Sequence, residues 1–287
     1  MLMDESKIEK SPVDKVIEIL GAPFCRGERY AIFNEDCIGA MRKLPSDFFD
    51  LIITSPPYNI GKEYEEKLSI EQYIEWSGKW ISEVHRVTKP QGAFWLNLGY
   101  VPLEGKAKAI PLPYLLWNKI PFFLMQEVVW NYGAGVAAKK TLSPRNEKFL
   151  WYVKNQDSYT FNLDEIRDPD VKYPNQKKNG KLRCNTIGKN PSDVWQIAKV
   201  TSGMQRSSVE RTPHPAQFPM DLIERLVKGF SNESDVLMDP FMGSGTTAEC
   251  ALHENRYVIG FELRKDYCSH IKDRLDLVEA KKASDLF

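Results

Sequence analysis

The 287-residue sequence lacks several features that mark particular classes of protein. No apolar run approaches the roughly twenty residues that a membrane-spanning helix needs. The N-terminal residues are polar and charged, without the apolar core of a secretion signal. The five cysteines are odd in number and include no Cys-x-x-Cys pair, which argues against a disulfide framework and a zinc site. We therefore expect an intracellular protein with no membrane association and no metal.

Charge is not in short supply, but its sum is zero. The distribution is uneven, because the segment from Lys139 to Arg211 holds fifteen Lys and Arg against eight Asp and Glu. A basic segment inside an otherwise acidic chain predicts a local surface for a polyanion. A solvated loop region with a chance excess of positive charge is the alternative.

Short β-branched runs alternate with amphipathic stretches along most of the chain, which predicts an α/β fold with a doubly wound, mostly parallel sheet. Lys89 to Gly92 is expected to form a turn. Between 155 and 212 apolar runs are few, which indicates an insertion on the sheet. The expected strands are 30–33, 49–54, 93–98, 122–130, 148–154, 236–238 and 257–261. The expected helices are 12–20, 38–44, 70–87, 112–119, 219–230, 246–254 and one carrying 267–278.

The expected strand 49–54 runs into the segment TSPPYN, residues 54–59. The two prolines stop the strand and stiffen a polar tip that carries Ser55 and Tyr58. In an open α/β sheet, ligands bind beyond the carboxyl ends of the strands. The segment is therefore a candidate site, and an ordinary strand-to-loop turn is the alternative.

A second strand end lies far along the chain. The strand 236–238 leads into a turn with Gly243 and Gly245, then a helix, and then a strand that ends at Glu262. Glycines let a backbone approach a ligand, and an acid about twenty residues on can accept hydrogen bonds from ribose hydroxyls. The third glycine of the dinucleotide fingerprint is missing, which favours a nucleoside over a diphosphate cofactor. A tight turn with a packing role is the alternative.

Together these motifs resemble the DNA amino-methyltransferases, which use S-adenosylmethionine to methylate the exocyclic amine of cytosine or adenine. Ser55-Pro56-Pro57-Tyr58 resembles the catalytic tetrapeptide of that family. Asp239-Pro240-Phe241-x-Gly243-x-Gly245 resembles its cofactor loop. The order of tetrapeptide, basic segment and cofactor loop resembles the β arrangement of the family, of restriction-modification type, and the match runs from about Tyr30 to Leu277.

The resemblance implies a Rossmann-like methyltransferase divided into four parts. An N-terminal extension with a helix covers 1–29, and the catalytic half of the domain covers 30–154. The basic target-recognition insertion covers 155–212, and the cofactor-binding half covers 213–287.

The chemistry of these residues agrees with that resemblance. The lone pair of an exocyclic amine is delocalised into the base ring, so the amine is a poor nucleophile. The Ser55 hydroxyl and the Pro56 carbonyl can accept hydrogen bonds from the amine, and Pro57 helps to hold them rigidly. Tyr58 can stack on a base that has been flipped out of the duplex. Ser55 is thus expected to act as a hydrogen-bond acceptor and to form no covalent adduct.

Further residues take cofactor roles only through the resemblance. Asp36 and Cys37 would lie by the adenine, although Asp36 could instead cap a helix. His214 and Gln217 would lie near the methionine end, although a histidine before proline could be structural. Glu262 would accept from the ribose. The cofactor loop would contribute Asp239, Phe241, Gly243, Ser244, Gly245 and Thr246.

The basic insertion would contact DNA, and we expect duplex DNA as the partner. Serine in the first tetrapeptide position resembles the cytosine-N4 branch, and adenine N6 is the alternative target. Methylation of RNA or of a protein amide is a more remote alternative, as is a DNA-binding protein without activity. The family implies a prokaryotic or phage-encoded cytoplasmic protein, often with a companion restriction endonuclease, as a monomer or homodimer. The candidate DNA contacts are Arg145, Lys177, Lys178, Lys181, Arg183, Lys189, Arg206 and Arg211.

Overall fold

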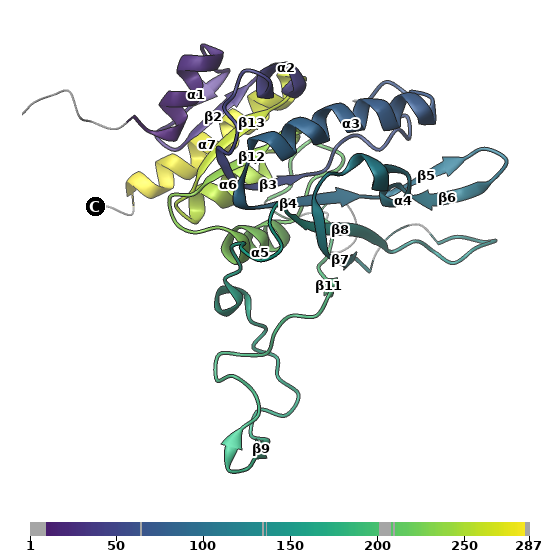
Figure 1. The fold of residues 1–287 in the computed structure, drawn as a ribbon, viewed down its shortest axis with the longest axis vertical. Coiled ribbons are helices and arrows are strands. Elements are labelled where there is room, and N and C mark those ends of the chain that lie inside the picture. Colours follow the sequence, from purple (N-terminus) through teal and green to yellow (C-terminus); the bar gives the residue numbers. More distant parts are fainter. Residues whose placement is uncertain are drawn as a thin grey trace, which may run out of the picture.

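A nine-stranded sheet forms the centre of the molecule (Figure 1). The computed structural model describes residues 10–63, 65–133, 135, 137–200, 208 and 210–284. In spatial order the strands are β1 (Cys25–Arg26), β2 (Tyr30–Phe33), β13 (Tyr257–Phe261), β12 (Val236–Asp239), β3 (Phe49–Thr54), β4 (Thr88–Leu98), β8 (Asn146–Val153), β7 (Phe123–Asn131) and β11 (Val194–Gln196).

The sheet is mostly parallel, as expected. Five neighbouring pairs run parallel, from β2 with β13 through to β3 with β4, and also β7 with β11. Strand β8 runs antiparallel to both β4 and β7, and β1 runs antiparallel to β2. The central pair, β3 and β12, joins segments almost two hundred positions apart in the sequence.

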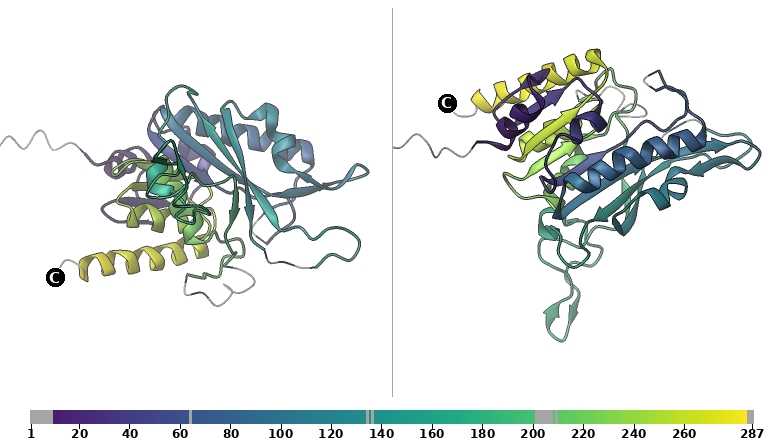
Figure 2. Two further views of the ribbon diagram at one scale, coloured as in Figure 1. Left: turned by 90° about the horizontal axis from the view of Figure 1, so that it is seen from below. Right: turned by 45° about the horizontal axis from the view of Figure 1, so that its top comes forward.

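Helices cover both faces of the sheet, so the doubly wound arrangement is confirmed. In β3, Leu51 and Ile53 belong to one apolar cluster while Phe49 and Ile52 belong to the other. In the left view of Figure 2, α3 and α7 lie on opposite sides of the sheet. One face carries α1 (Pro12–Leu20), α2 (Cys37–Met41), α3 (Ile70–Val87) and α4 (Leu112–Leu116), which continues as η2 (Trp117–Lys119). The other carries α5 (Met220–Phe230), α6 (Thr246–His253) and α7 (Lys265–Ser284).

Local capping explains where the helices begin. Ser11 caps α1 by accepting a hydrogen bond from the Asp14 backbone N–H at 3.1 Å. Ser69 and Gln72 form a reciprocal capping box at the start of α3. None of the described helices is long and apolar enough to cross a membrane.

The expected turn at Lys89–Gly92 is wrong, because these residues lie inside the long strand β4. The register against β3 shifts between Phe49 and Leu51, so the extra residues form an irregularity in the strand. Gly92 fits here because a Cβ would lie 2.9 Å from the carbonyl oxygen of Asp50.

A hairpin of β5 (Tyr100–Leu103) and β6 (Ala107–Pro111) is absent from the strands expected above. Its strands have a mixed exposure pattern without a clear apolar face. Within the expected insertion 155–212, β11 pairs with β7 at the edge of the main sheet. That short piece of the segment is therefore part of the sheet.

Most of the basic segment forms an arm that projects from the sheet after η3 (Leu163–Ile166) (Figure 1). At its base, Asp168 and Lys189 pair through two backbone hydrogen bonds of 3.0 and 2.9 Å. At its tip, β9 (Lys177–Lys178) and β10 (Lys181–Leu182) pair antiparallel around Asn179-Gly180. Both turn residues have positive φ, 52° and 77°, which suits a two-residue hairpin turn.

Candidate functional site

The two strand ends identified in the sequence lie side by side at the carboxyl edge of the sheet. Thr54 ends β3 and Asp239 ends β12, and these strands pair directly. The Thr54 hydroxyl donates to Asp239 Oδ1 at 2.7 Å, and the Thr247 hydroxyl donates to Asp239 Oδ2 at 2.8 Å. The Phe241 backbone N–H adds a third hydrogen bond, to Oδ1, at 3.1 Å. One carboxylate therefore ties the TSPPYN tip to the glycine loop.

Asp239 is 3% exposed, so its charge is withdrawn from water. Burial raises the pKa of this carboxyl to about 6, while its hydrogen bonds from Thr54, Thr247 and Phe241 act in the opposite direction. Both of its oxygens face donors of the chain itself. The cofactor contact predicted for Asp239 stays untested, and the geometry gives its side chain a role in shaping the site.

Ser55 and Tyr58 meet at a third residue, Asn97, which sequence reasoning missed. The Ser55 and Tyr58 hydroxyls lie 2.9 Å apart. The Tyr58 hydroxyl donates to Asn97 Oδ1 at 2.6 Å, and Ser55 reaches the same atom at 3.3 Å. Asn97 is 1% exposed, and it is the one polar residue in the run AFWLNL of β4. That isolated polar residue was the available signal.

The backbone around the tip leaves little freedom for the Tyr58 ring. A Cβ on Gly99 would lie 2.7 Å from Tyr58 Cε2, so the ring rests directly against the glycine backbone. The Tyr73 hydroxyl donates to the Pro57 carbonyl at 2.8 Å. Beyond the tip, Glu65 accepts from the backbone N–H groups of Asn59 and Ile60, each at 2.7 Å. The tip is thus fixed on both sides.

The glycine loop has the conformation that a close approach to a ligand requires. Gly243 and Gly245 have φ of 54° and 79°, in the left-handed region that favours glycine. The Gly243 N–H donates to Glu262 Oε2 at 2.9 Å, and the Arg264 N–H donates to Glu262 Oε1 at 2.9 Å. Burial raises the pKa of Glu262. Each of its oxygens keeps a lone pair for a further donor.

His214 and Gln217 shape the wall beside the glycine loop. A Cβ on Gly243 would lie 3.1 Å from His214 Nε2, and the His214 ring packs edge-on against Tyr267. Burial, with Arg264 nearby, lowers the pKa of His214 to about 4, so the imidazole is neutral at physiological pH. Gln217 is 2% exposed. Its amide accepts from the Thr212 N–H at 2.7 Å and donates to the carbonyl of Glu210.

The remaining cofactor candidates surround the same edge. Asp36 caps α2 through Oδ2, which accepts from the Gly39 N–H at 2.8 Å, as the alternative interpretation predicted. Cys37 is buried beside it. Phe241 packs against Trp76 and Trp80 of α3, with ring centroids 5.7 and 5.3 Å away.

Arg274 of α7 supports the loop and was also missed. Its Nη1 donates to the Ser244 carbonyl at 3.0 Å and to the Thr246 hydroxyl at 3.1 Å. The Ser244 and Thr246 hydroxyls lie 3.1 Å apart. An arginine on an amphipathic helix is expected to face solvent. The sequence therefore gives no sign that Arg274 is buried against the loop.

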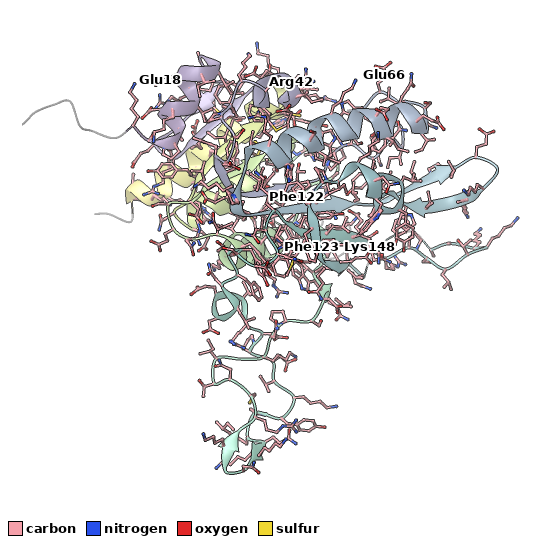
Figure 3. The ribbon with its side chains drawn as sticks, viewed as in Figure 1. Glu18, Arg42, Glu66, Phe122, Phe123 and Lys148 are labelled. Carbon is pink, nitrogen blue, oxygen red and sulfur yellow. The ribbon has the colours of Figure 1, made fainter. Side chains whose placement is uncertain are left out.

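The candidate DNA contacts separate into groups. Lys177, Lys178 and Lys181 are exposed at the arm's tip, where side chains spread around a thin stalk (Figure 3). Lys189 instead bonds within the arm, with its Nζ 3.1 Å from Asp168 Oδ2. Arg183 is exposed and donates to Gln176 Oε1 at 3.2 Å.

Two further candidate arginines, Arg145 and Arg211, lie off the arm. Arg145 precedes β8, and its guanidinium lies against Gly135. Arg211 is exposed in the segment leading to Gln217. Arg206 falls outside the described residues. Within the described part of the chain, no group of three or more His, Cys, Asp or Glu side chains could hold a metal ion.

Comparisons with known proteins place this geometry in context. A family model described as DNA methylase matches residues 49–273. The type II methyltransferase M.ScaI of Streptomyces caespitosus is 58% identical over 257 residues, which cover 90% of this chain and 84% of that protein. The DNA adenine methyltransferase YhdJ of Escherichia coli strain K12 is 32% identical over 268 residues, covering 90% of this chain and 87% of that protein.

Solved structures share the fold. The PvuII DNA methyltransferase (cytosine-N4-specific) has a TM-score of 0.70 at 20% identity, over 88% of this chain and 89% of that one. A putative DNA modification methylase of Thermus thermophilus, complexed with S-adenosyl-L-methionine, has a TM-score of 0.61 at 21% identity, over 86% of this chain and 93% of that one. The Rossmann-like class expected from the sequence is confirmed.

Replacing the buried carboxylate should change how stability depends on pH. The folded-state pKa of Asp239, about 6, is above its value in an unfolded chain, so its stabilising contribution is complete below about pH 4 and is lost as pH rises through 6. Asp239→Asn keeps the hydrogen-bonding shape without the charge. The difference in unfolding free energy, variant minus wild type, should rise by about 2 kcal/mol between pH 4.5 and 7. Urea titrations at several pH values would measure this, with Asp157→Asn as an exposed control. A constant difference across the range would contradict it.

Adding a methyl group at Gly99 should displace the Tyr58 ring. In Gly99→Ala the new methyl would lie 2.7 Å from the ring, so the ring must move. We expect methyl transfer to fall about tenfold to a hundredfold, the cost of small misplacements in an active site. Cofactor affinity should change little, and the unfolding free energy should fall by about 1–3 kcal/mol, the usual cost of overpacking. Gly78→Ala, where the added Cβ meets only the flexible Lys119 side chain, is the matched control. Equal rates for both variants would refute the role of Gly99.

Proposed function

Because the chain belongs to the DNA methylase family, whose model matches residues 49–273, we propose that it methylates the N4 amine of a flipped cytosine in duplex DNA. S-adenosylmethionine is the methyl donor. One observation carries the proposal: the SPPY tip and the glycine loop end adjacent strands and share the Asp239 carboxylate. An amine held at one tip would face a donor held at the other.

The residues at the glycine loop fit this cofactor. Glu262 has lone pairs left for the ribose hydroxyls, and Asp36 has a second carboxylate oxygen beyond the one that caps α2. Gly243 and Gly245 give the loop its tight left-handed turns, and Gly245 packs against Ile271. When bound, the cofactor supplies a methyl group already activated by a positively charged sulfur. The chain must therefore supply binding and alignment.

At the other tip, the chain would act on the amine. The Ser55 hydroxyl and Pro56 carbonyl would accept its hydrogen bonds and so favour a localised lone pair. Hydrogen bonds among Ser55, Tyr58 and Asn97 preorient these groups before a base arrives. This arrangement needs no covalent intermediate.

Cytosine is the first candidate base, and adenine N6 is the second. Ser55 at the head of the tetrapeptide supports cytosine through its resemblance to that branch. The 32% identity to a protein named as a DNA adenine methyltransferase supports adenine. Discrimination would come from the shape of the base pocket, because either amine presents the same hydrogen-bond donors to Ser55.

The arm would bring the DNA. A two-stranded ribbon fits the major groove, and the lysines at the arm's tip lie away from the ion pair that holds Lys189 at the arm's base. Similarity to a bacterial type II methyltransferase supports a bacterial cytoplasmic location. Similarity to a type II methyltransferase supports a companion endonuclease that cuts the same site.

The product identifies the base. Purified protein with labelled S-adenosylmethionine and duplex DNA should yield N4-methylcytosine after digestion to nucleosides and mass analysis. Ser55→Ala should bind cofactor normally and lose about a hundredfold in transfer rate, as for other aligned hydrogen-bonding groups. Ser269→Ala, at an exposed position of α7, is the control. N6-methyladenine as the sole product would reassign the base, and transfer to RNA or protein alone would overturn the DNA substrate.

The arm should contribute phosphate contacts. Replacing Lys177, Lys178 and Lys181 together by alanine should weaken DNA binding and reduce the salt slope of log affinity by about three, roughly one for each lost contact. Cofactor affinity should be unchanged. Removing the same charge from α7, at Lys265, Lys272 and Lys281, is the control. A salt slope equal to that of wild type would show that the arm's tip does not meet the DNA backbone.

A further inference from the structure

We propose that Glu147, at the start of β8, accepts the proton that methyl transfer releases, through the hydroxyls of Tyr58 and Ser55. This inference rests on the proposed function of the same site. Glu147 touches neither substrate nor cofactor in this scheme. It acts through Tyr58 and is a positioning and proton-accepting residue, one step behind the tip.

The reaction must dispose of one proton. As the amine lone pair forms the new N–C bond, the S–C bond breaks and its electron pair stays on sulfur. The nitrogen then carries a surplus proton and a positive charge. That proton passes to Ser55 Oγ as the Ser55 proton passes to Tyr58 Oη and the Tyr58 proton passes to Glu147. The methylated amine, both hydroxyls and the sulfur end neutral, and Glu147 ends as a carboxylic acid.

The distances form a continuous hydrogen-bonded chain. Ser55 Oγ and Tyr58 Oη are 2.9 Å apart, and Tyr58 Oη lies 3.2 Å from Glu147 Oε2. Asn97 Oδ1, 2.6 Å from Tyr58 Oη, is the alternative acceptor for the single Tyr58 hydroxyl proton. An amide oxygen is a very weak base, and the Asn97 Nδ2 is engaged with the Lys148 carbonyl. Of the two acceptors, Glu147 is the one that can hold a proton.

Glu147 is paired with a cation beside the tip. Lys199 Nζ lies 2.6 Å from Glu147 Oε1. The same ammonium lies 3.8 Å from the centre of the Tyr132 ring. Burial chiefly, and then the Glu147 charge, raises the pKa of Tyr132 to about 12, so Tyr132 stays neutral. Arg145 is the other nearby cation, on the approach to β8.

Glu147 also has a route to water. Its side chain is 16% exposed and that of Lys199 is 23% exposed, unlike the fully enclosed Asn97. A proton delivered to Glu147 can therefore leave for solvent and restore the ion pair. The ion pair also links the tip to residue 199, which follows the edge strand β11, so the segment leaving the arm helps to hold Tyr58.

Glu147→Gln tests the proposal, because glutamine keeps the size of the side chain and cannot accept the proton. We expect the single-turnover rate of methyl transfer to fall about a hundredfold, the lower range for proton-transfer catalysis, with cofactor and DNA affinities unchanged. Glu127→Gln is the matched control, since it removes the carboxylate of a similar ion pair with Lys148.

A double variant separates a relay from simple packing. Tyr58→Phe interrupts the chain, so adding Glu147→Gln to it should cause no further loss of rate. A multiplicative loss in the double variant, or a rate of Glu147→Gln within about twofold of wild type, would each overturn the inference. A wild-type protein that methylates no DNA would instead refute the proposed function itself.

Discussion

The hydrogen bonds that converge on the Asp239 carboxylate hold the site together. They join the last residue of β3 to the last residue of β12 and to Thr247 at the start of α6. Strand pairing alone brings the two tips to the same edge of the sheet, but it leaves the loops beyond free to diverge. A carboxylate that accepts from both loops removes that freedom. The distance between a bound methyl donor and a bound amine would then be set by a buried contact.

Such a contact has a cost that the fold must offset. Withdrawing a carboxylate from water is unfavourable, and its raised pKa expresses that penalty. Two hydroxyls and one backbone N–H compensate in part. The arrangement persists because apolar clusters on both faces of the sheet fix the strands below it. The rigid scaffold thus keeps an unfavourable buried charge in place where alignment matters most.

The sequence predicted local features well and contacts across strands poorly. Both tips, most helices and the parallel character of the sheet follow from periodicity and from proline and glycine positions. Asn97 and Glu147 could not be assigned, because their meeting with Tyr58 depends on the registers of β4 against β3 and of β8 against β4. The β5–β6 hairpin could not be predicted, because its residues do not alternate between apolar and polar. Lys89-Pro90 has the composition of a turn. It lies within β4 because the register of β4 shifts against β3 at this point, and a single sequence does not show that shift.

The family resemblance gives all the cofactor candidates the same role. The structure separates them by whether their polar atoms bond to the chain or stay available to a ligand. Asp239 and Gln217 direct their polar atoms to the chain itself, whereas Glu262 and Asp36 keep acceptor capacity. His214 Nδ1 likewise accepts a hydrogen bond from the chain, from the Ala216 N–H. If the methionine end of the donor lies beside it, as the resemblance implies, a charged imidazole would repel the positive sulfur. Burial keeps His214 neutral, so the wall beside Gly243 can enclose a cation without opposing it. The residues that shape the loop are therefore neutral or, like Asp239, already hydrogen-bonded within the chain. The carboxylates of Glu262 and Asp36 keep acceptor atoms for the ligand.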